Sequence, residues 1–316
     1  MPKQQFDYDT LKKYAIYETI TGSHSYGLQI ESSDTDIKGI VILPKEVQFT
    51  LADEWETTSF HSPDIEYHSL KKFMRLASTQ NPTVLEMLYT DQAFVVKSTP
   101  AAEQLRKHRH LFLSRNCFYT YGGYARQQLM KLKNGLEKAT PEDHNDHLQY
   151  TVQNIIRGFG ERYSAFDDDN IRIVDVQYDH DKKQQLYIAI DFGCVPITQL
   201  SGMVSEIQNA YKGYTKLTNR NKKTEEKLGK HAMHLVRLFK TGIEALESGT
   251  IQVKRENDRD FLLAIRNGKY EWDEIFSMIK QLERDLQKAY ATTRLPKTVD
   301  HEKINELYKE IMLASI

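Results

Sequence analysis

The chain has 316 residues, a formal net charge of -1, 40% hydrophobic residues and a mean hydropathy of -0.61, a composition that excludes a disordered chain and a mini-protein and allows two subdomains. The two cysteines, Cys117 and Cys194, are far apart and not in a CxxC spacing, which excludes a disulfide framework and a thiolate zinc site. The amino-terminal segment lacks the apolar core of a signal peptide, and no stretch approaches the roughly 18 apolar residues that span a bilayer, so we expect a cytoplasmic protein with no membrane partner.

The first hundred residues are predicted to form a small mixed β-sheet with short helices. β-Branched or alternating side chains indicate strands at three places, residues 16–20, 35–43 and 55–67. Helical spacing of apolar residues occurs at residues 8–16, 70–80 and 84–88. The helix that begins at Leu70 is expected to stop before Asn81, because Pro82 disfavours helical backbone at the residue that precedes it. The α/β part is therefore expected to end near residue 100.

The remainder of the chain is predicted to be mainly helical. Helical spacing occurs over residues 101–113, 118–133, 144–166, 202–211, 228–246 and 272–291. Between these helices, two β-rich runs within residues 171–197 flank a turn-like segment at 179–183, which predicts an inserted β-hairpin. We therefore expect an α+β protein, with an α/β core at residues 1–100 and a helical domain at residues 101–316.

The most informative segment covers residues 19–40, with the sequence TITGSHSYGLQIESSDTDIKGI. Gly22 and Ser23 follow a predicted strand, where backbone N–H groups at the start of a helix favour a phosphate. Asp34 and Asp36 are separated by one residue, so on a strand both carboxylates project from one face. Mg²⁺ prefers such hard oxygen ligands together with substrate phosphates, the arrangement that nucleotidyl transfer requires.

The Gly-Ser signature followed by Asp-x-Asp resembles that of the DNA polymerase β-like nucleotidyltransferase superfamily. More narrowly, the segments GSHSYGLQIESSDTDIKGI, NPTVLEMLY, GYARQQL, KHAMHLVRL and FLLAIRNGK are similar to predicted nucleotidyltransferases associated with RNA-repair ligases, which are common in phages and bacteria. The resemblance covers most of the chain and is weakest near residues 171–197. It implies a core sheet with helical flanks, transfer of NMP from an NTP, and dependence on Mg²⁺ or Mn²⁺.

A third acid on a neighbouring strand is implied by the resemblance. The matching segment is PDIEYHS, residues 63–69, in which Asp64 matches best and Glu66 is an alternative two residues later on the same face. The resemblance assigns the metal ions to Asp34, Asp36 and Asp64. Either Asp64 or Glu66 is then expected to help deprotonate an acceptor hydroxyl.

A second signal is the Lys/Arg-rich run over residues 215–240. On a helix, Lys230, His234 and Arg237 share one face. The resemblance assigns triphosphate binding to Lys230 and Arg237, with Gly22 and Ser23 holding the phosphates from the other side. Further basic residues that could contact a triphosphate or an RNA backbone are Arg220, Lys222 and Lys223. An ordinary solvated helix face remains the alternative.

Structural interpretations remain open for several other features. Tyr26 could pack the first helix instead of touching a nucleotide, and the Asp-x-Asp pair could lie in a solvated turn. His144 and His147 could bind a metal, although a helix amino-terminal capping segment explains this region better. The aromatic residues Phe118, Tyr119, Tyr121 and Tyr124 could stack on a base, but such spacing is more typical of core packing.

The predicted function is metal-dependent transfer of NMP from an NTP to a hydroxyl acceptor, with RNA as the expected acceptor and a functional link to an RNA ligase. RNA is favoured because the resemblance is to families linked with RNA repair. Two alternatives stay open. One is a toxin or defence enzyme that modifies protein or tRNA by the same chemistry, and the other is a non-catalytic module that binds nucleotide or RNA.

Overall fold

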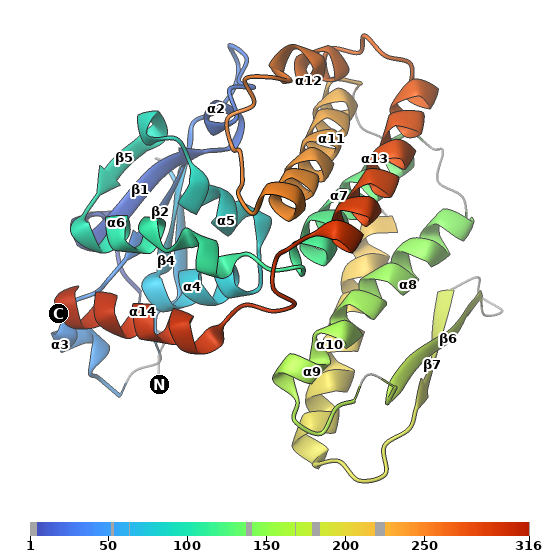
Figure 1. The fold of residues 1–316 in the computed structure, drawn as a ribbon, viewed down its shortest axis with the longest axis horizontal. Helices are drawn as coiled ribbons and strands as arrows, with labels where there is room; N and C mark the ends of the chain where they lie inside the picture. Colours follow the sequence, from blue (N-terminus) through green and yellow to red (C-terminus); the bar gives the residue numbers. More distant parts are fainter. Residues whose placement is uncertain are drawn as a thin grey trace. The chain divides into compact units, whose positions relative to one another are not determined.

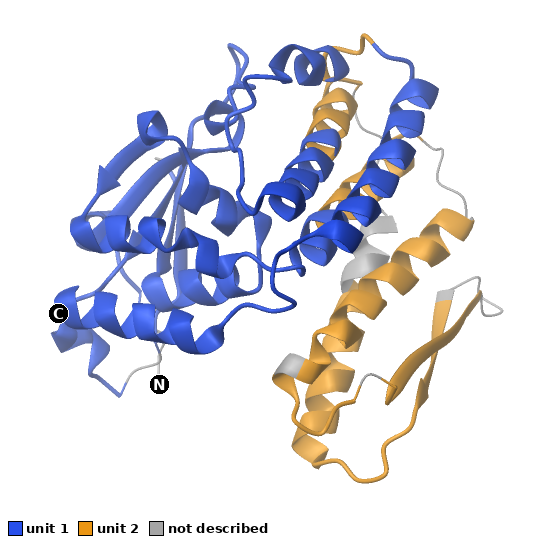
Figure 2. Ribbon diagram, in the orientation of Figure 1, with its two compact units in different colours: residues 1–122, 236–265, 270–316 blue, residues 123–235, 266–269 orange. Residues whose placement is uncertain are grey.

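The computed structural model describes residues 5–51, 54–62, 64–136, 141–167, 169–178, 184–218 and 225–315. Contacts divide the chain into two compact units, coloured separately in Figure 2. Unit 1 comprises residues 1–122, 236–265 and 270–316, and unit 2 comprises residues 123–235 and 266–269. The predicted α+β class, with a small mixed sheet and a mainly helical carboxyl-terminal part, is confirmed (Figure 1). A functional boundary near residue 100 stays a prediction.

Unit 1 contains a five-stranded sheet. Its strands are β1 (Ala15–Thr21), β2 (Asp36–Val41), β3 (Thr57–His61), β4 (Asp64–Ser69) and β5 (Val95–Ser98), in the spatial order β3-β4-β2-β1-β5. β2 and β4 pair in parallel, while the other neighbours are antiparallel. The prediction of one strand over residues 55–67 is wrong, because the chain turns at Ser62 and forms two paired strands.

The helices before the middle of the chain are mostly short. They are α1 (Tyr8–Tyr14), α2 (Gly22–Ser25), α3 (Lys45–Gln48), α4 (Leu70–Ser78), α5 (Pro82–Tyr89) and α6 (Pro100–Lys107), with 3₁₀ turns η1 (Gln92–Phe94) and η2 (Arg109–Phe112). α5 begins where the sequence indicates a break: the Asn81 side chain accepts a hydrogen bond from the Val84 N–H, and Pro82 occupies the first turn.

Five longer or later helices contribute to unit 1. They are α7 (Cys117–Gly135), α11 (Glu225–Ser248), α12 (Arg259–Arg266), α13 (Trp272–Thr292) and α14 (His301–Ser315). α7 and α11 also run into unit 2. The sequence patterns predicted α7, α11 and α13 but not α12 or α14.

One face of the sheet is packed with apolar side chains. Leu11 of α1, Trp55 and the strand residues Val41, Ile65 and Tyr67 form a buried cluster there. On the opposite face, the Tyr17 hydroxyl donates to the Met87 carbonyl oxygen of α5 at 2.9 Å. α5 therefore packs on the face that also carries the alternating polar residues of β2 and β4.

Unit 2 contains the predicted hairpin. Its elements are α8 (Pro141–Arg157), α9 (Phe159–Arg162), β6 (Ile171–Tyr178), β7 (Gln184–Ile190) and α10 (Ile197–Thr218). The hairpin prediction is confirmed by the β6–β7 pairing, and its turn at 179–183 lies outside the described residues. The expectation of one helix over residues 144–166 is wrong, because Gly158 separates α8 from α9. A cluster that includes Leu148, Phe159 and Ile171 forms its core.

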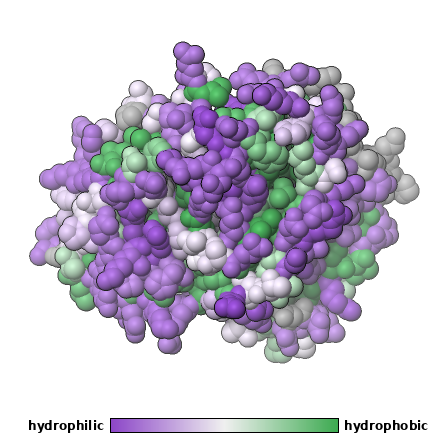
Figure 3. Space-filling model, turned by 45° about the horizontal axis from the view of Figure 1, so that its top comes forward, coloured by the Kyte–Doolittle hydropathy of each residue, from purple (hydrophilic) through white to green (hydrophobic). Residues whose placement is uncertain are grey.

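Hydrophilic side chains cover most of the face seen in Figure 3, as the mean hydropathy of -0.61 leads one to expect. Within the described ranges, no helix combines the length and the apolar character that crossing a membrane requires.

Candidate functional site

The sheet places two of the predicted acids next to each other. β2 and β4 run parallel with Ile37 opposite Ile65, so Asp36 and Asp64 begin neighbouring strands side by side. Because side chains alternate along a strand, both acids project to the face opposite buried Ile65. Asp64 is exposed and Asp36 is half-buried. The register therefore brings together two carboxylates that are far apart in sequence.

Glu66 lies on the same face but is engaged by a neighbour. Lys38, its partner in the register, donates to Oε2 of Glu66, and His68 Nε2 lies 3.5 Å from the same oxygen. Burial raises the pKa of the Glu66 carboxyl, but the hydrogen bond and the charge of Lys38 outweigh burial and lower the pKa overall. Burial also lowers the pKa of His68. Glu66 is therefore a carboxylate that already has a counter-ion.

These residues line a pocket of about 300 Å³. Its walls come from β1, α2, β2, β4 and α5, and they comprise Thr21, Gly22, Ser25, Tyr26, Asp36, Ile37, Lys38, Asp64, Glu66, Thr83, Glu86, Met87 and Thr90. Four carboxylates and one lysine are among them. A pocket of this composition suits a cation or a cationic complex better than an apolar ligand.

Gly22 opens a single helical turn at the edge of this pocket. Its φ of +68° favours glycine, and a Cβ placed on it would lie 2.7 Å from Oδ2 of Asp36. Two hydrogen bonds close the turn. The Ser25 hydroxyl donates to the Gly22 carbonyl oxygen at 3.0 Å, and the Leu28 backbone N–H donates to the Ser23 carbonyl oxygen at 2.8 Å. The Gly22 main chain is thus packed directly against the Asp36 carboxylate.

The structure does not place Asp34 and Ser23 on the pocket wall. The expectation that Asp34 and Asp36 share one strand face is wrong, because β2 begins only at Asp36 and Asp34 is exposed in the preceding loop. His24 contacts this loop, with Nε2 3.3 Å from the Ser33 carbonyl oxygen. No group of three His, Cys, Asp or Glu side chains within the described ranges is gathered closely enough to hold a metal ion. Metal binding by Asp34 stays a prediction.

Arg237 is buried instead of facing solvent. Its side chain is 2% exposed, and Nη1 donates to Oε1 of Glu86 at 2.6 Å. The guanidinium lies 3.7 Å from the ring centroid of Tyr26, whose hydroxyl donates to Oε2 of Glu86 at 2.5 Å. Burial, reinforced by the charge of Glu86, raises the pKa of Tyr26 despite the opposing charge of Arg237. A direct contact of Arg237 with a triphosphate stays a prediction.

The other basic residues of the predicted stripe are not part of this pocket wall. Lys230 is exposed and His234 is half-buried, and both belong to unit 2. The further candidates Arg220, Lys222 and Lys223 lie outside the described residues.

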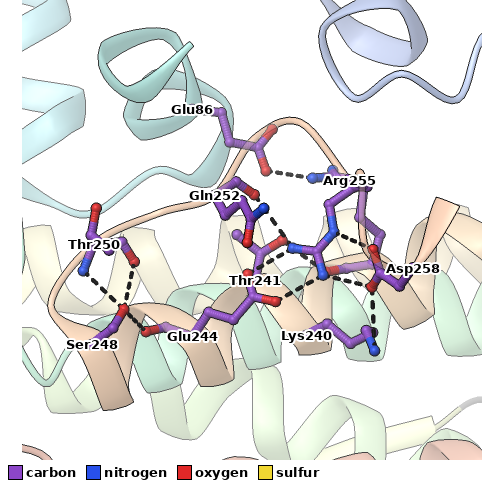
Figure 4. Close-up of polar contacts among 10 residues, drawn as sticks. Glu86, Lys240, Thr241, Glu244, Ser248, Thr250, Gln252, Arg255 and Asp258 are labelled. Atoms are coloured by element: carbon purple, nitrogen blue, oxygen red, sulfur yellow. Dashed lines mark hydrogen bonds and ion pairs between the residues drawn. The ribbon is translucent and has the colours of Figure 1, made fainter. Parts of the chain in front are cut away.

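A second polar cluster lies at the carboxyl-terminal end of α11. The Arg255 guanidinium, 3% exposed, donates to both oxygens of Glu244 at 2.7 and 2.8 Å (Figure 4). It also donates to Asp258 at 3.0 and 2.7 Å, and Lys240 lies 3.2 Å from the same carboxylate. Burial lowers the pKa of Arg255, but the hydrogen bonds that its guanidinium donates to Asp258 and Glu244 outweigh burial and raise the pKa overall. This cluster fixes the connection between α11 and α12.

Sequence reasoning missed Lys38 and Glu86 as members of the site. Glu86 could have been found from the sequence, because an acid within the apolar helix PTVLEMLY requires a buried partner. The packing interpretation of the aromatic cluster is confirmed for Phe118 and Tyr119, which contact the Tyr290 ring at centroid distances of 4.5 and 5.7 Å. Tyr121 is fully buried.

Comparison with known proteins matches the amino-terminal half of the chain to a family. A protein of Enterobacteria phage T4, named an uncharacterized 38.9 kDa protein in the nrdC-mobD intergenic region, is 31% identical over 128 residues, which are 37% of this chain and 38% of that protein. The uncharacterized protein YcgL of Bacillus subtilis (strain 168) is 32% identical over 126 residues, 39% of this chain and 48% of YcgL. The matches thus span less than half the length of either relative.

No solved structure gives a significant match. Residues 8–153 match the RNA repair pathway DNA polymerase beta family (RlaP), and this stretch contains Gly22, Asp36, Asp64 and Glu86. The matched stretch is somewhat less than half of the chain, and over it the chain is similar to polymerase β-like nucleotidyltransferases of an RNA repair pathway.

Proposed function

We propose that the pocket between β2, β4 and α5 catalyses metal-dependent transfer of NMP from an NTP to a hydroxyl group of RNA. The observation that carries this proposal is the parallel register that sets Asp36 beside Asp64, at the edge where Gly22 begins its turn. The match of residues 8–153 to a polymerase β-like family supports the same chemistry.

A divalent metal ion, Mg²⁺ or Mn²⁺, is the cofactor that this donor set fits. Asp36 and Asp64 offer hard carboxylate oxygens on one pocket wall. Glu66 is less suited as a ligand because Lys38 already neutralises it. Asp34 would complete the set from the loop that precedes β2. When bound, the ion supplies Lewis-acid stabilisation of charge on the phosphate oxygens.

The chain's own residues bind the substrates and move the proton. Backbone N–H groups of Gly22 and Ser23 hold phosphate oxygens; because α2 is a single turn, they act as hydrogen-bond donors and not through a helix dipole. Lys38 offers a positive charge within the same pocket. The acceptor oxygen attacks the α-phosphorus, the bond to the β-phosphate oxygen breaks, pyrophosphate leaves, and Asp64 accepts the hydroxyl proton.

RNA is the proposed acceptor because the matched family is described by an RNA repair pathway. A net charge of -1 gives no general attraction to a polyanion, so binding would depend on local cations such as exposed Lys230. A functional link to an RNA ligase, which would join ends after nucleotide addition, is part of the same proposal.

The test is transfer of label from each α-labelled NTP, with Mg²⁺ or Mn²⁺, to a mixture of RNA and protein. We expect label in RNA with the wild type and none with Asp36→Asn. Asp260→Asn is the matched control, because the Asp260 side chain is fully exposed on α12. Label in protein would instead identify an enzyme of the toxin or defence type. Binding of NTP without transfer would identify a binding module.

A further inference from the structure

Tyr26, Glu86 and Arg237 form a cluster at the pocket, in which half-buried Tyr26 and buried Glu86 belong to the pocket wall and buried Arg237 does not. Each carboxylate oxygen of Glu86 has its own donor, Arg237 at 2.6 Å and the Tyr26 hydroxyl at 2.5 Å. The side chains of Glu86 and Arg237 are 7% and 2% exposed. Buried charge-assisted hydrogen bonds of this kind are strong and directional. The Glu86 carboxylate therefore cannot change its orientation in the pocket wall without losing one of these bonds.

The same turn is held from a second direction by residues more than two hundred positions later. The backbone N–H of Arg255 donates to the Tyr26 carbonyl oxygen at 2.9 Å, and the side-chain Nε of Arg259 donates to the Gly27 carbonyl oxygen at 2.8 Å. Arg255 is itself fixed by Glu244 of α11 (Figure 4). α11 thus fixes the turn over residues 22–27 twice, once through Arg237 and once through the segment that follows the helix.

The turn over residues 22–27 supports the Asp36 carboxylate, which the proposed function makes catalytic. Gly22 packs so closely on Asp36 that a Cβ there would lie 2.7 Å from Oδ2. Any displacement of the turn therefore moves the surface against which Asp36 rests. Neither Tyr26 nor Arg237 needs to touch a substrate to have this effect.

We propose that Tyr26, Glu86 and Arg237 are positioning residues that hold the turn over residues 22–27 against Asp36. The inference extends the proposed function, because it assigns α11 an indirect role in that reaction. It also predicts that these three side chains hold the backbone of the turn in place, which can be measured in the absence of any reaction.

The test compares Tyr26→Phe with Tyr67→Phe. Both changes remove a hydroxyl that donates to a buried glutamate, since Tyr67 donates to Glu18 and lies on the opposite face of the sheet. The Tyr26→Phe ring can still stack on Arg237, which favours retention of the fold. We expect similar changes in Tm for the two variants, whereas KM for NTP rises about fivefold or more in Tyr26→Phe alone.

Hydrogen exchange of backbone amides supplies a readout that does not depend on activity. The N–H groups of Tyr26, Gly27 and Leu28 are bonded within the turn, and we expect them to exchange faster in Tyr26→Phe but not in Tyr67→Phe. Equal exchange in this peptide in the two variants overturns the positioning role. If the wild type shows no transfer while the exchange difference is present, the proposed function fails and the positioning of the turn stands.

Discussion

The position of Gly22 requires glycine for two reasons. The backbone φ is +68°, and the Asp36 carboxylate leaves no space for a side chain at residue 22. We expect Gly22→Ala to lose stability by about 1–2 kcal/mol from backbone strain and to lose nucleotidyl transfer because the added methyl group displaces the Asp36 carboxylate. Urea unfolding and label transfer from NTP measure the two effects.

Gly268→Ala is the matched control for this change. Gly268 has a φ of +71°, and a Cβ there would meet nothing within 4 Å. The control should show a similar loss of stability and full activity. Equal activity of the two alanine variants would show that the contact between Gly22 and Asp36 does not matter for the reaction.

At the residue scale, spacing in the sequence was sufficient to select Gly22 and Asp36, the family resemblance selected Asp64, and all three line the pocket. It could not show that Lys38 pairs with Glu66, because that contact depends on the register of two parallel strands. It also could not show that the chain enters β2 only at Asp36, since strand ends depend on pairing partners that a local pattern does not reveal.

At the scale of elements, α8 contains a histidine whose protonation opposes folding. Burial, followed by the charges of Arg126 and His144, lowers the pKa of His147 from 6.5 to about 4. Between these pH values the unfolded chain binds a proton that the folded chain does not. The contribution of neutral His147 to stability is therefore complete above pH 6.5 and is lost as pH falls towards 4, by about 3 kcal/mol in total.

We expect His147→Gln to flatten the dependence of the free energy of unfolding on pH in this range. The measurement is urea unfolding at several pH values between 7 and 4, with exposed His301→Gln as control. An identical pH dependence in the wild type and His147→Gln would contradict the buried neutral state.

Helical periodicity located most of the long helices but not α14, which has 15 residues, and the helix ends and the shortest elements could not be predicted. β5 has only four residues, Val95–Ser98, with alternate half-buried and exposed side chains, too few for a periodic signal. The chain divides α8 from α9 at Gly158, where an added Cβ would lie 2.4 Å from the flexible end of the Arg162 side chain. That contact is made only after the chain has folded.

At the scale of the whole molecule, an ion pair between Glu86 and Arg237 joins residues 151 positions apart. Arg237→Met should lower the free energy of unfolding by about 3–5 kcal/mol, because it leaves a buried carboxylate without its cation. The double variant Glu86→Leu/Arg237→Met should recover much of that loss, since neither charge then remains. Urea unfolding of the wild type, of Glu86→Leu, of Arg237→Met and of the double variant measures the coupling; strictly additive losses would contradict it.

The matched family region ends at residue 153, yet the turn that supports Asp36 is held by residues of α11 and the segment after it. The sequence resemblance predicts the chemistry of the first hundred residues. It could not identify this dependence, because contacts between distant segments follow from tertiary packing and leave no local pattern.

Catalysis of nucleotidyl transfer by Asp36 and Asp64 is tested most directly by the rate of pyrophosphate release from NTP with Mg²⁺ and RNA, measured in the wild type, Asp36→Asn, Asp64→Asn and Glu66→Gln. We predict that Asp36→Asn and Asp64→Asn lower the rate by about 10²–10⁴-fold. Glu66→Gln should lower it by about tenfold or less, because Glu66 acts through Lys38. A wild-type rate in Asp36→Asn would contradict the account.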